Sequence, residues 1–247
     1  MLRSSKEIIG YHMEANDGEI GKAKDFFFDD HAWKVRHLVV DTGKWLPGRK
    51  VLISPQALLE PDRENKLFRV DLTCDQIKHS PSIDLDKPVS RQHQIELFEY
   101  YSWTPYWGAG MVGPFPEPGV LTEENLPPEL DEDVEGERKH IRSMREVTGY
   151  HLVSGDEKIA KLSDFIVEDG SWIVRYVAVR THVHFSGVEV LLSPDWIEEI
   201  DWETKRIETD LSRDQILEAP PFDSLKPIDR EYEAQLHEHY GRTKYWE

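Results

Sequence analysis

Short apolar runs bounded by polar turn residues recur along the chain, and they are rich in β-branched and aromatic side chains. Runs of this length and composition are typical of β-strands rather than helices. In the first part of the chain they cover residues 7–13, 21–30, 34–42, 49–55, 57–61 and 66–73. With frequent turns between about six short strands, the pattern predicts a small β-barrel rather than a layered α/β domain.

Helix signals follow the strands. Thr73–Gln76 and Ser212–Gln215 have the spacing of a capping box, in which a hydroxyl and a side-chain amide satisfy backbone groups at a helix start. A longer amphipathic helix is expected after each, with Ser90 and Asp229 as candidate N-caps. Its apolar residues recur three or four positions apart and therefore share one face.

The chain contains an internal repeat. Residues 3–107 (copy one) match residues 142–246 (copy two) without a gap, at a constant offset of 139 positions. By direct count about 40% of roughly 105 aligned positions are identical, far beyond chance for a gapless match. The sequence therefore predicts two copies of one domain, related by an approximate two-fold axis.

The residues between the copies have a different composition. They are rich in Gly and Pro at first and then acidic, which is typical of a linker that cannot bury a core of its own. The expected organisation is a first repeat with its helical tail at 1–108, a linker at 109–140 and a second repeat with its tail at 141–247.

Each copy ends in an aromatic tail, and the same rings recur in both. The retained residues are Tyr101, Tyr106 and Trp107 in copy one and Tyr240, Tyr245 and Trp246 in copy two. Aromatic residues at fixed places in a repeat pack more often than they bind ligands. We interpret them as structural or interface residues, and we expect the tails to pack on the sister copy.

Charge and composition narrow the functional classes. The formal net charge of −18 disfavours nucleic-acid partners, because binding phosphates requires Lys and Arg. No apolar run is long enough to span a membrane, and the first residues lack the apolar core of a secretory signal. A single cysteine, Cys74, excludes an internal disulfide and a CxxC pair. A cytoplasmic protein is expected.

The order of several short motifs resembles the PRC-barrel domain. In copy one these are IGY, DGEIGKAKDF, VRHLVV, KVLISP and VDLT, at residues 9–11, 17–26, 35–40, 50–55 and 70–73. The PRC-barrel family includes the cytoplasmic part of the photosynthetic reaction-centre H subunit and the C-terminal domain of a ribosome maturation factor. The membrane helix of the former and the first domain of the latter have no counterpart here, so neither specific function is expected. The resemblance implies two tandem, non-catalytic barrels that dock to proteins.

Few residues suggest chemistry. Asp25 with Arg36, and Asp164 with Arg175, recur in both copies, and we expect each pair to form a partly buried cross-strand ion pair. His182 and His184 are secondary candidates for a metal site, since two imidazoles two positions apart share a face of an extended segment.

The chain carries none of the common nucleotide, hydrolase or metalloprotease motifs. We therefore expect a non-enzymatic interaction or assembly module without a cofactor. A peripheral contact with a membrane complex, of the photosynthetic type, belongs to this expectation, although the partner and the oligomeric state are not specified by the sequence. The alternative is a small-molecule or metal-binding protein that uses the interface between the copies.

Overall fold

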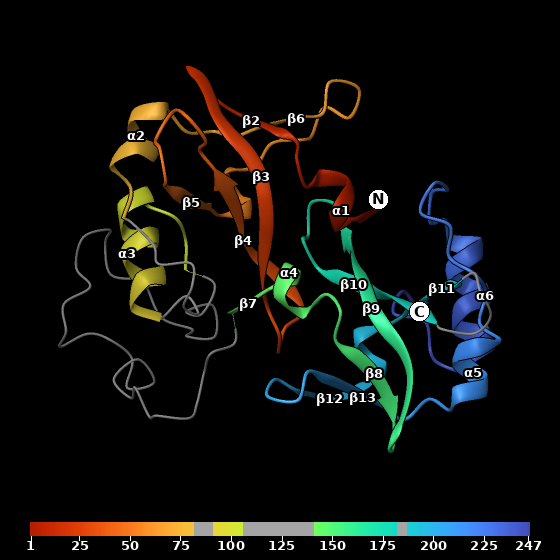
Figure 1. Cartoon of the computed structure of the whole chain (residues 1–247). Coiled ribbons are helices and arrows are strands. Elements are labelled where there is room, and N and C mark those ends of the chain that lie inside the picture. The colour runs from red at the N-terminus through yellow and green to blue at the C-terminus, as the bar shows by residue number, and fades with distance from the viewer. Residues whose placement is uncertain (82–90, 106–140, 182–186) are drawn as a thin grey trace. The chain divides into compact units, whose positions relative to one another are not determined.

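The computed structural model describes residues 1–81, 91–105, 141–181 and 187–247 (Figure 1). The fold is mainly β, with 40% of the described residues in strands and 23% in helices, as the sequence pattern predicts. The described residues divide into two compact units. Unit 1 comprises Met1–Gly10, Asp25–Arg36 and Ser143–Glu247, and unit 2 comprises Tyr11–Lys24 and His37–Arg142.

The larger sheet has the strand order β11-β10-β9-β8-β13-β12, and β1 also pairs with β9. Its strands are β1 (Leu2–Ser4), β8 (His151–Ser154), β9 (Glu157–Glu168), β10 (Val174–Thr181), β11 (Glu189–Leu192), β12 (Ile197–Asp201) and β13 (Arg206–Thr209). All neighbours are antiparallel except β8 and β13, which are parallel. The first strand of the chain thus pairs with a strand of copy two.

The second sheet has the order β5-β4-β3-β2-β6, and β7 also pairs with β3. Its strands are β2 (His12–Ala15), β3 (Gly18–Asp29), β4 (Lys34–Asp41), β5 (Lys50–Ile53), β6 (Leu67–Arg69) and β7 (Ile141–Ser143). Among the strands of the described residues no pairing joins β5 to β6 or β11 to β12, so both strand paths are open.

The helices are α1 (Ser5–Ile8), α2 (Cys74–His79), α3 (Arg91–Tyr101), α4 (Met144–Val147), α5 (Arg213–Leu217) and α6 (Arg230–Tyr240), with the 3-10 turns η1 (Pro55–Ala57) and η4 (Pro194–Trp196). Of the helices, α2, α3, α5 and α6 lie where the sequence signals place them, whereas α1 and α4 are not expected from the sequence. Both capping boxes form, at Thr73 and Ser212, and Asp229 caps α6 as expected. Ser90 lies outside the described residues.

Two strand expectations are wrong. The run 7–13 is not one strand, because α1 occupies its start and Gly10, at φ +92°, turns the chain before β2 begins at His12. The run 57–61 of copy one forms only isolated bridges, Leu58 with Val70 and Asp62 with Leu67, whereas its counterpart in copy two forms β12. Pro61, which has no N–H to donate to a ladder, stands where copy two has Ile200.

Unit 1 is assembled from both copies through reciprocal contacts. The N–H of Val35 donates to the carbonyl of Trp172 (2.8 Å), and the N–H of Val174 donates to the carbonyl of Trp33 (2.7 Å). Val35 and Val174 are equivalent under the 139-residue offset, and so are Trp33 and Trp172. The N–H of each copy therefore donates to the equivalent carbonyl of the other copy. Phe28 packs on Phe165 beneath them, with ring centroids 5.2 Å apart.

The core of unit 2 is built on the inward faces of its strands and on α2 and α3. Its largest fully buried side chains are Met13, Ile20, Leu38, Leu52, Ile53, Phe68, Ile77 and Leu97. Gly21 fits here because a Cβ on it would lie 2.1 Å from the carbonyl oxygen of Asp41, and its φ is +135°.

We predict that Gly21→Ala lowers the free energy of unfolding by more than about 2 kcal/mol, since a methyl group cannot fit against the backbone and the φ value is strained for alanine. Copy two has Ala160 at the equivalent position, which provides a matched control. Ala160→Gly should cost about 1 kcal/mol through chain entropy and a lost buried methyl. Urea unfolding measures both, and equal small losses would contradict the steric argument.

Candidate functional site

An extensive set of polar contacts within unit 1 lies where β1 adds to β9. The backbone register places Leu2 opposite Glu168, Arg3 opposite Val167 and Ser4 opposite Ile166. Side chains then fix this register at two adjacent points, Arg3 and the pair Ser4–Ser5.

Arg3 provides the first point. Its guanidinium is only 5% exposed and forms a bidentate ion pair with the carboxylate of Asp169, with N–O distances of 2.9 and 2.8 Å. The planar guanidinium matches a carboxylate in this geometry better than a lysine could. The ion pair between Arg3 and Asp169 therefore fixes the register of β1 on β9 and also compensates the charge of Arg3.

Asp164 provides the second point, and it is only 5% exposed. Its carboxylate accepts hydrogen bonds from the hydroxyls of Ser4 and Ser5, the latter at 2.8 Å, and from the N–H of Phe165 at 2.8 Å. Donors of this kind offset part of the desolvation of a buried carboxylate. The two serines of the first segment therefore solvate an acid of the second copy.

Asp25 makes the equivalent contact in the opposite direction. It accepts from the hydroxyl of Ser143 (2.6 Å), from the N–H of Arg145 (3.1 Å) and from the N–H of Phe26 (2.8 Å). Burial raises the pKa of Asp25, and the bonds from Ser143, Arg145 and Phe26 oppose that rise. The same Ser143 hydroxyl accepts from the N–H of Glu146 and so caps α4.

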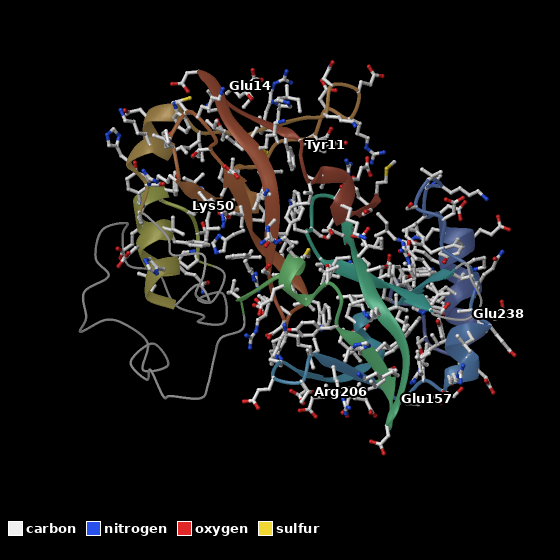
Figure 2. All side chains as sticks on the ribbon, in the orientation of Figure 1. Tyr11, Glu14, Lys50, Glu157, Arg206 and Glu238 are labelled. Atoms are coloured by element: carbon white, nitrogen blue, oxygen red, sulfur yellow. The ribbon has the colours of Figure 1, made fainter. Side chains whose placement is uncertain are left out.

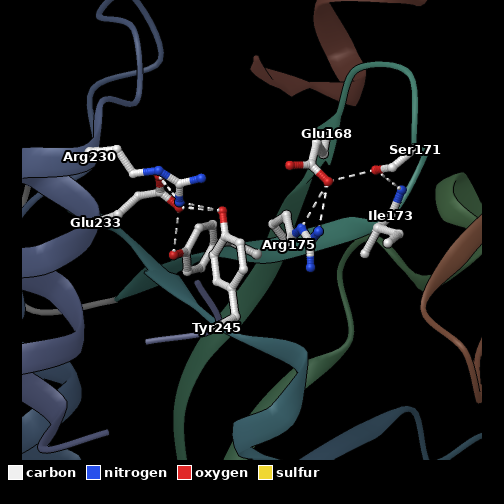
Figure 3. Close-up of polar contacts among 8 residues, drawn as sticks. Glu168, Ser171, Ile173, Arg175, Arg230, Glu233 and Tyr245 are labelled. Atoms are coloured by element: carbon white, nitrogen blue, oxygen red, sulfur yellow. Dashed lines mark hydrogen bonds and ion pairs between the residues drawn. The ribbon is translucent and has the colours of Figure 1, made fainter. Parts of the chain in front are cut away.

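The expected ion pairs of these aspartates are therefore wrong in their partners. Arg36 pairs with Asp29 (3.0 Å) and Arg175 with Glu168 (2.7 Å), as Figure 3 shows for the second pair. The register explains this, because Asp164 lies opposite Ala178 and a register shift between Val174 and Tyr176 carries Arg175 toward the end of β9. The aspartates are buried, as expected, but hydroxyls and amides surround them instead.

A second polar group is buried where α6 packs on β10. Glu233 and His237, both at most 3% exposed, lie one helical turn apart and converge on the hydroxyl of Tyr176. That hydroxyl lies 3.0 Å from Glu233 Oε2 and 3.1 Å from His237 Nε2. Tyr245 donates a further hydrogen bond to Glu233 (2.8 Å), and Arg230 contacts the other carboxylate oxygen (3.1 Å; Figure 3).

The tautomer of His237 follows from its partners. Nδ1 lies 2.9 Å from the carbonyl of Thr243, which can only accept, so Nδ1 carries the proton and Nε2 accepts. Tyr176 then has one proton for two acceptors, Glu233 and His237. Burial lowers the pKa of His237, whereas the Thr243 bond and the charge of Glu233 oppose that change. Burial and the Glu233 charge raise the pKa of Tyr176, so it stays a donor.

The aromatic tail of copy two packs within copy two, not on the sister copy. Tyr240 is buried against Trp196 (4.8 Å between centroids), and the Tyr245 ring lies 4.4 Å below the guanidinium of Arg175. Trp246 packs edge-on against His237 (5.3 Å). These rings hold the last residues of the chain on α6 and β10.

Of the corresponding copy-one residues, Tyr101 stacks on Trp103 with centroids 4.2 Å apart. Tyr106 and Trp107 lie outside the described residues, and so do the metal candidates His182 and His184. Within the described ranges no group of three or more His, Cys, Asp and Glu side chains is placed to hold a metal ion. In that same part of the chain no helix has the length and apolarity that a bilayer crossing requires.

Sequence reasoning missed the Tyr176–Glu233–His237 group. Copy one has His37, Gln94 and Phe98 at these positions, so the group breaks the repeat. The signal that could have revealed this group is the change, between the two copies, of polar residues at helix positions that face the core. The contacts of Ser4 and Ser143 were present in the sequence as the shared Arg-Ser pair, but their partners lie too far along the chain to be inferred.

We predict that Asp164→Ala lowers the free energy of unfolding by about 2–4 kcal/mol, because it leaves two hydroxyls and an amide without their acceptor. The exposed Asp156→Ala variant, in the β8–β9 turn, serves as the control and should change stability by less than about 0.5 kcal/mol. Urea unfolding monitored by tryptophan fluorescence measures both. Equal effects of the two substitutions would show that Asp164 does not hold the segment.

We further predict a pH dependence that depends on His237. Because the pKa of His237 is lowered on folding, the unfolded chain binds more protons, and stability falls as pH drops below about 6.5. His237→Phe, which introduces the copy-one residue, should flatten the loss of stability between about pH 7 and pH 5. Tyr245→Phe retains the imidazole and should retain the slope. Parallel pH profiles for wild type and His237→Phe would refute this assignment.

A scan against models of known protein families finds no match to the chain, and a search of curated proteins finds no similar sequence.

Proposed function

We propose that the chain is a non-catalytic protein-interaction or assembly module made of two tandem PRC-type barrels. The repeat, the strand-rich fold and the helices that follow each strand set support this assignment. The reciprocal backbone contacts of Trp33 and Trp172 support an approximate two-fold relation between the copies. The proposal includes a partner in a membrane-associated complex, which the likeness to the reaction-centre H subunit suggests.

The observation that carries the proposal is the addition of β1 to β9. An extended segment is bound there by backbone pairing, and its side chains are read by Asp169 and Asp164. Strand addition of this kind is a common mode of peptide recognition, in which main-chain bonds provide affinity and side-chain contacts provide specificity. The fold thus has the features needed to bind extended protein segments.

The small-molecule alternative has a weaker basis in the described residues. An open hollow of about 600 Å³ lies at the C-terminal end of α6 and is lined by His237, Glu238, Arg242, Thr243, Lys244 and Glu247, among others. His237 is the buried polar group among these, and its two nitrogens contact Thr243 and Tyr176. Protein docking therefore remains the function that we propose.

We predict that the tagged full-length chain, isolated with crosslinking from its source cells, brings down a protein with which it forms a stoichiometric complex. The test is reconstitution from the two purified proteins, with the mass measured by light scattering after size exclusion. A complex with a defined ratio supports the proposal. The proposal is refuted by two results together. In mixtures with each copurified protein the chain still elutes at its own mass, and native mass spectrometry of the chain shows a bound small molecule.

A further inference from the structure

The edge strand β12 of the larger sheet has no regular strand as its counterpart in copy one. In copy two β12 runs over Ile197–Asp201 and pairs with β13, which places it at the end of the strand order. In copy one the same positions form only two isolated bridges and contain Pro61. Proline is a common device for blunting a sheet edge, because it removes a backbone donor. Copy two has Ile200 in its place and keeps a strand.

The outer face of this edge carries an unbalanced charge. Glu199 lies directly opposite Glu208 in the β12–β13 register, and like charges at such positions are destabilising. Within the described part of the chain no hydrogen bond or ion pair is formed by the carboxylates of Glu198, Glu199 or Glu208. Copy one has Arg69 at the position of Glu208, and Arg69 pairs with Glu14 (3.1 Å). At this position copy one thus has a cation paired with a carboxylate, whereas copy two has a carboxylate.

The inner face of the edge is apolar. Ile200 pairs with Ile207, which is buried, and side chains alternate along a strand, so Glu199 and Asp201 point outward. Figure 2 shows Arg206, opposite Asp201, at the end of this hairpin, where side chains project from the ribbon. The register shift lies between Ile197 and Glu199, which leaves Ile200 and Asp201 in regular pairing. A strand that fits here alternates apolar and cationic side chains.

We propose that the β12 edge is a docking site for an extended, Lys- or Arg-bearing segment of a partner protein, which adds beside β12 and places its cations next to Glu199 and Glu208. The inference rests on the proposed function and specifies the chemistry of its partner. Charge complementarity selects this occupant. A second copy of this chain would bring the same acidic edge and be repelled, whereas a basic strand relieves the Glu199–Glu208 repulsion.

The test measures binding of a fluorescent hexapeptide of alternating Lys and Val to the full chain by anisotropy. Two variants introduce copy-one residues at the edge: Ile200→Pro blunts the strand and Glu208→Arg restores the charge balance. We expect each to weaken binding at least tenfold while circular dichroism shows a folded protein. Glu238→Arg makes the same change in net charge at an exposed position on α6, labelled in Figure 2, and should alter binding less than twofold. A peptide with Pro in place of its central Val should bind at least tenfold more weakly.

The edge proposal is overturned if the wild-type chain does not bind the peptide, or if Ile200→Pro and Glu208→Arg bind as the wild type does. It is also overturned if Glu238→Arg weakens binding as much as Glu208→Arg, because the contact would then be unspecific charge attraction. Ile200→Pro also separates the two proposals. If it still forms the reconstituted partner complex, only the edge assignment fails, whereas absence of any partner complex for wild type refutes the module itself.

Discussion

Buried carboxylates that accept hydrogen bonds from hydroxyls and backbone amides, rather than pairing with cations, join the two copies of this chain. Asp164 receives Ser4 and Ser5, and Asp25 receives Ser143 and the N–H of Arg145. A buried acid without such donors would be strongly destabilising, so the first residues of each copy are needed by the other. This constraint explains why unit 1 combines residues 1–10 and 25–36 with copy two. The donors come from the ends of β1 and β7 and from the first turns of α1 and α4.

The contacts of Asp164 and Asp25 with the first residues of the other copy, which we call the joint, involve residues that both copies share, whereas other positions differ. The Arg-Ser pair and the aspartates are shared, whereas the residues under α6 and along the β12 edge differ. In copy two, Glu233 and His237 of α6 contact the hydroxyl of Tyr176 on β10. Tyr245 donates a hydrogen bond to Glu233, and Trp246 packs against His237. A buried network of this kind is favourable only when each member finds its partner, which ties the position of α6 to that of the last residues. The two copies thus share one scaffold and differ in the polar residues that it carries.

Sequence reasoning recovered what depends on local chemistry. Period, β-branched content and turn residues located most strands, and the capping boxes at Thr73 and Ser212 formed as expected because their donors and acceptors lie within one turn. It failed where a contact depends on register between distant segments. Asp25 and Arg36 lie on neighbouring strands, yet Arg36 pairs with Asp29, and the serines that bind the two aspartates come from more than 100 residues away. The described strands also do not close into the barrel that the sequence pattern predicts, because their paths are open.

Amide hydrogen exchange of the native chain tests the joint most directly. In the antiparallel register the N–H of Arg3 points toward Val167, so if β1 is an integral strand of the larger sheet this amide exchanges with a protection similar to that of β9, because both open together. Exchange of the Arg3 amide at the rate of a free peptide, beside a protected β9, would contradict the account.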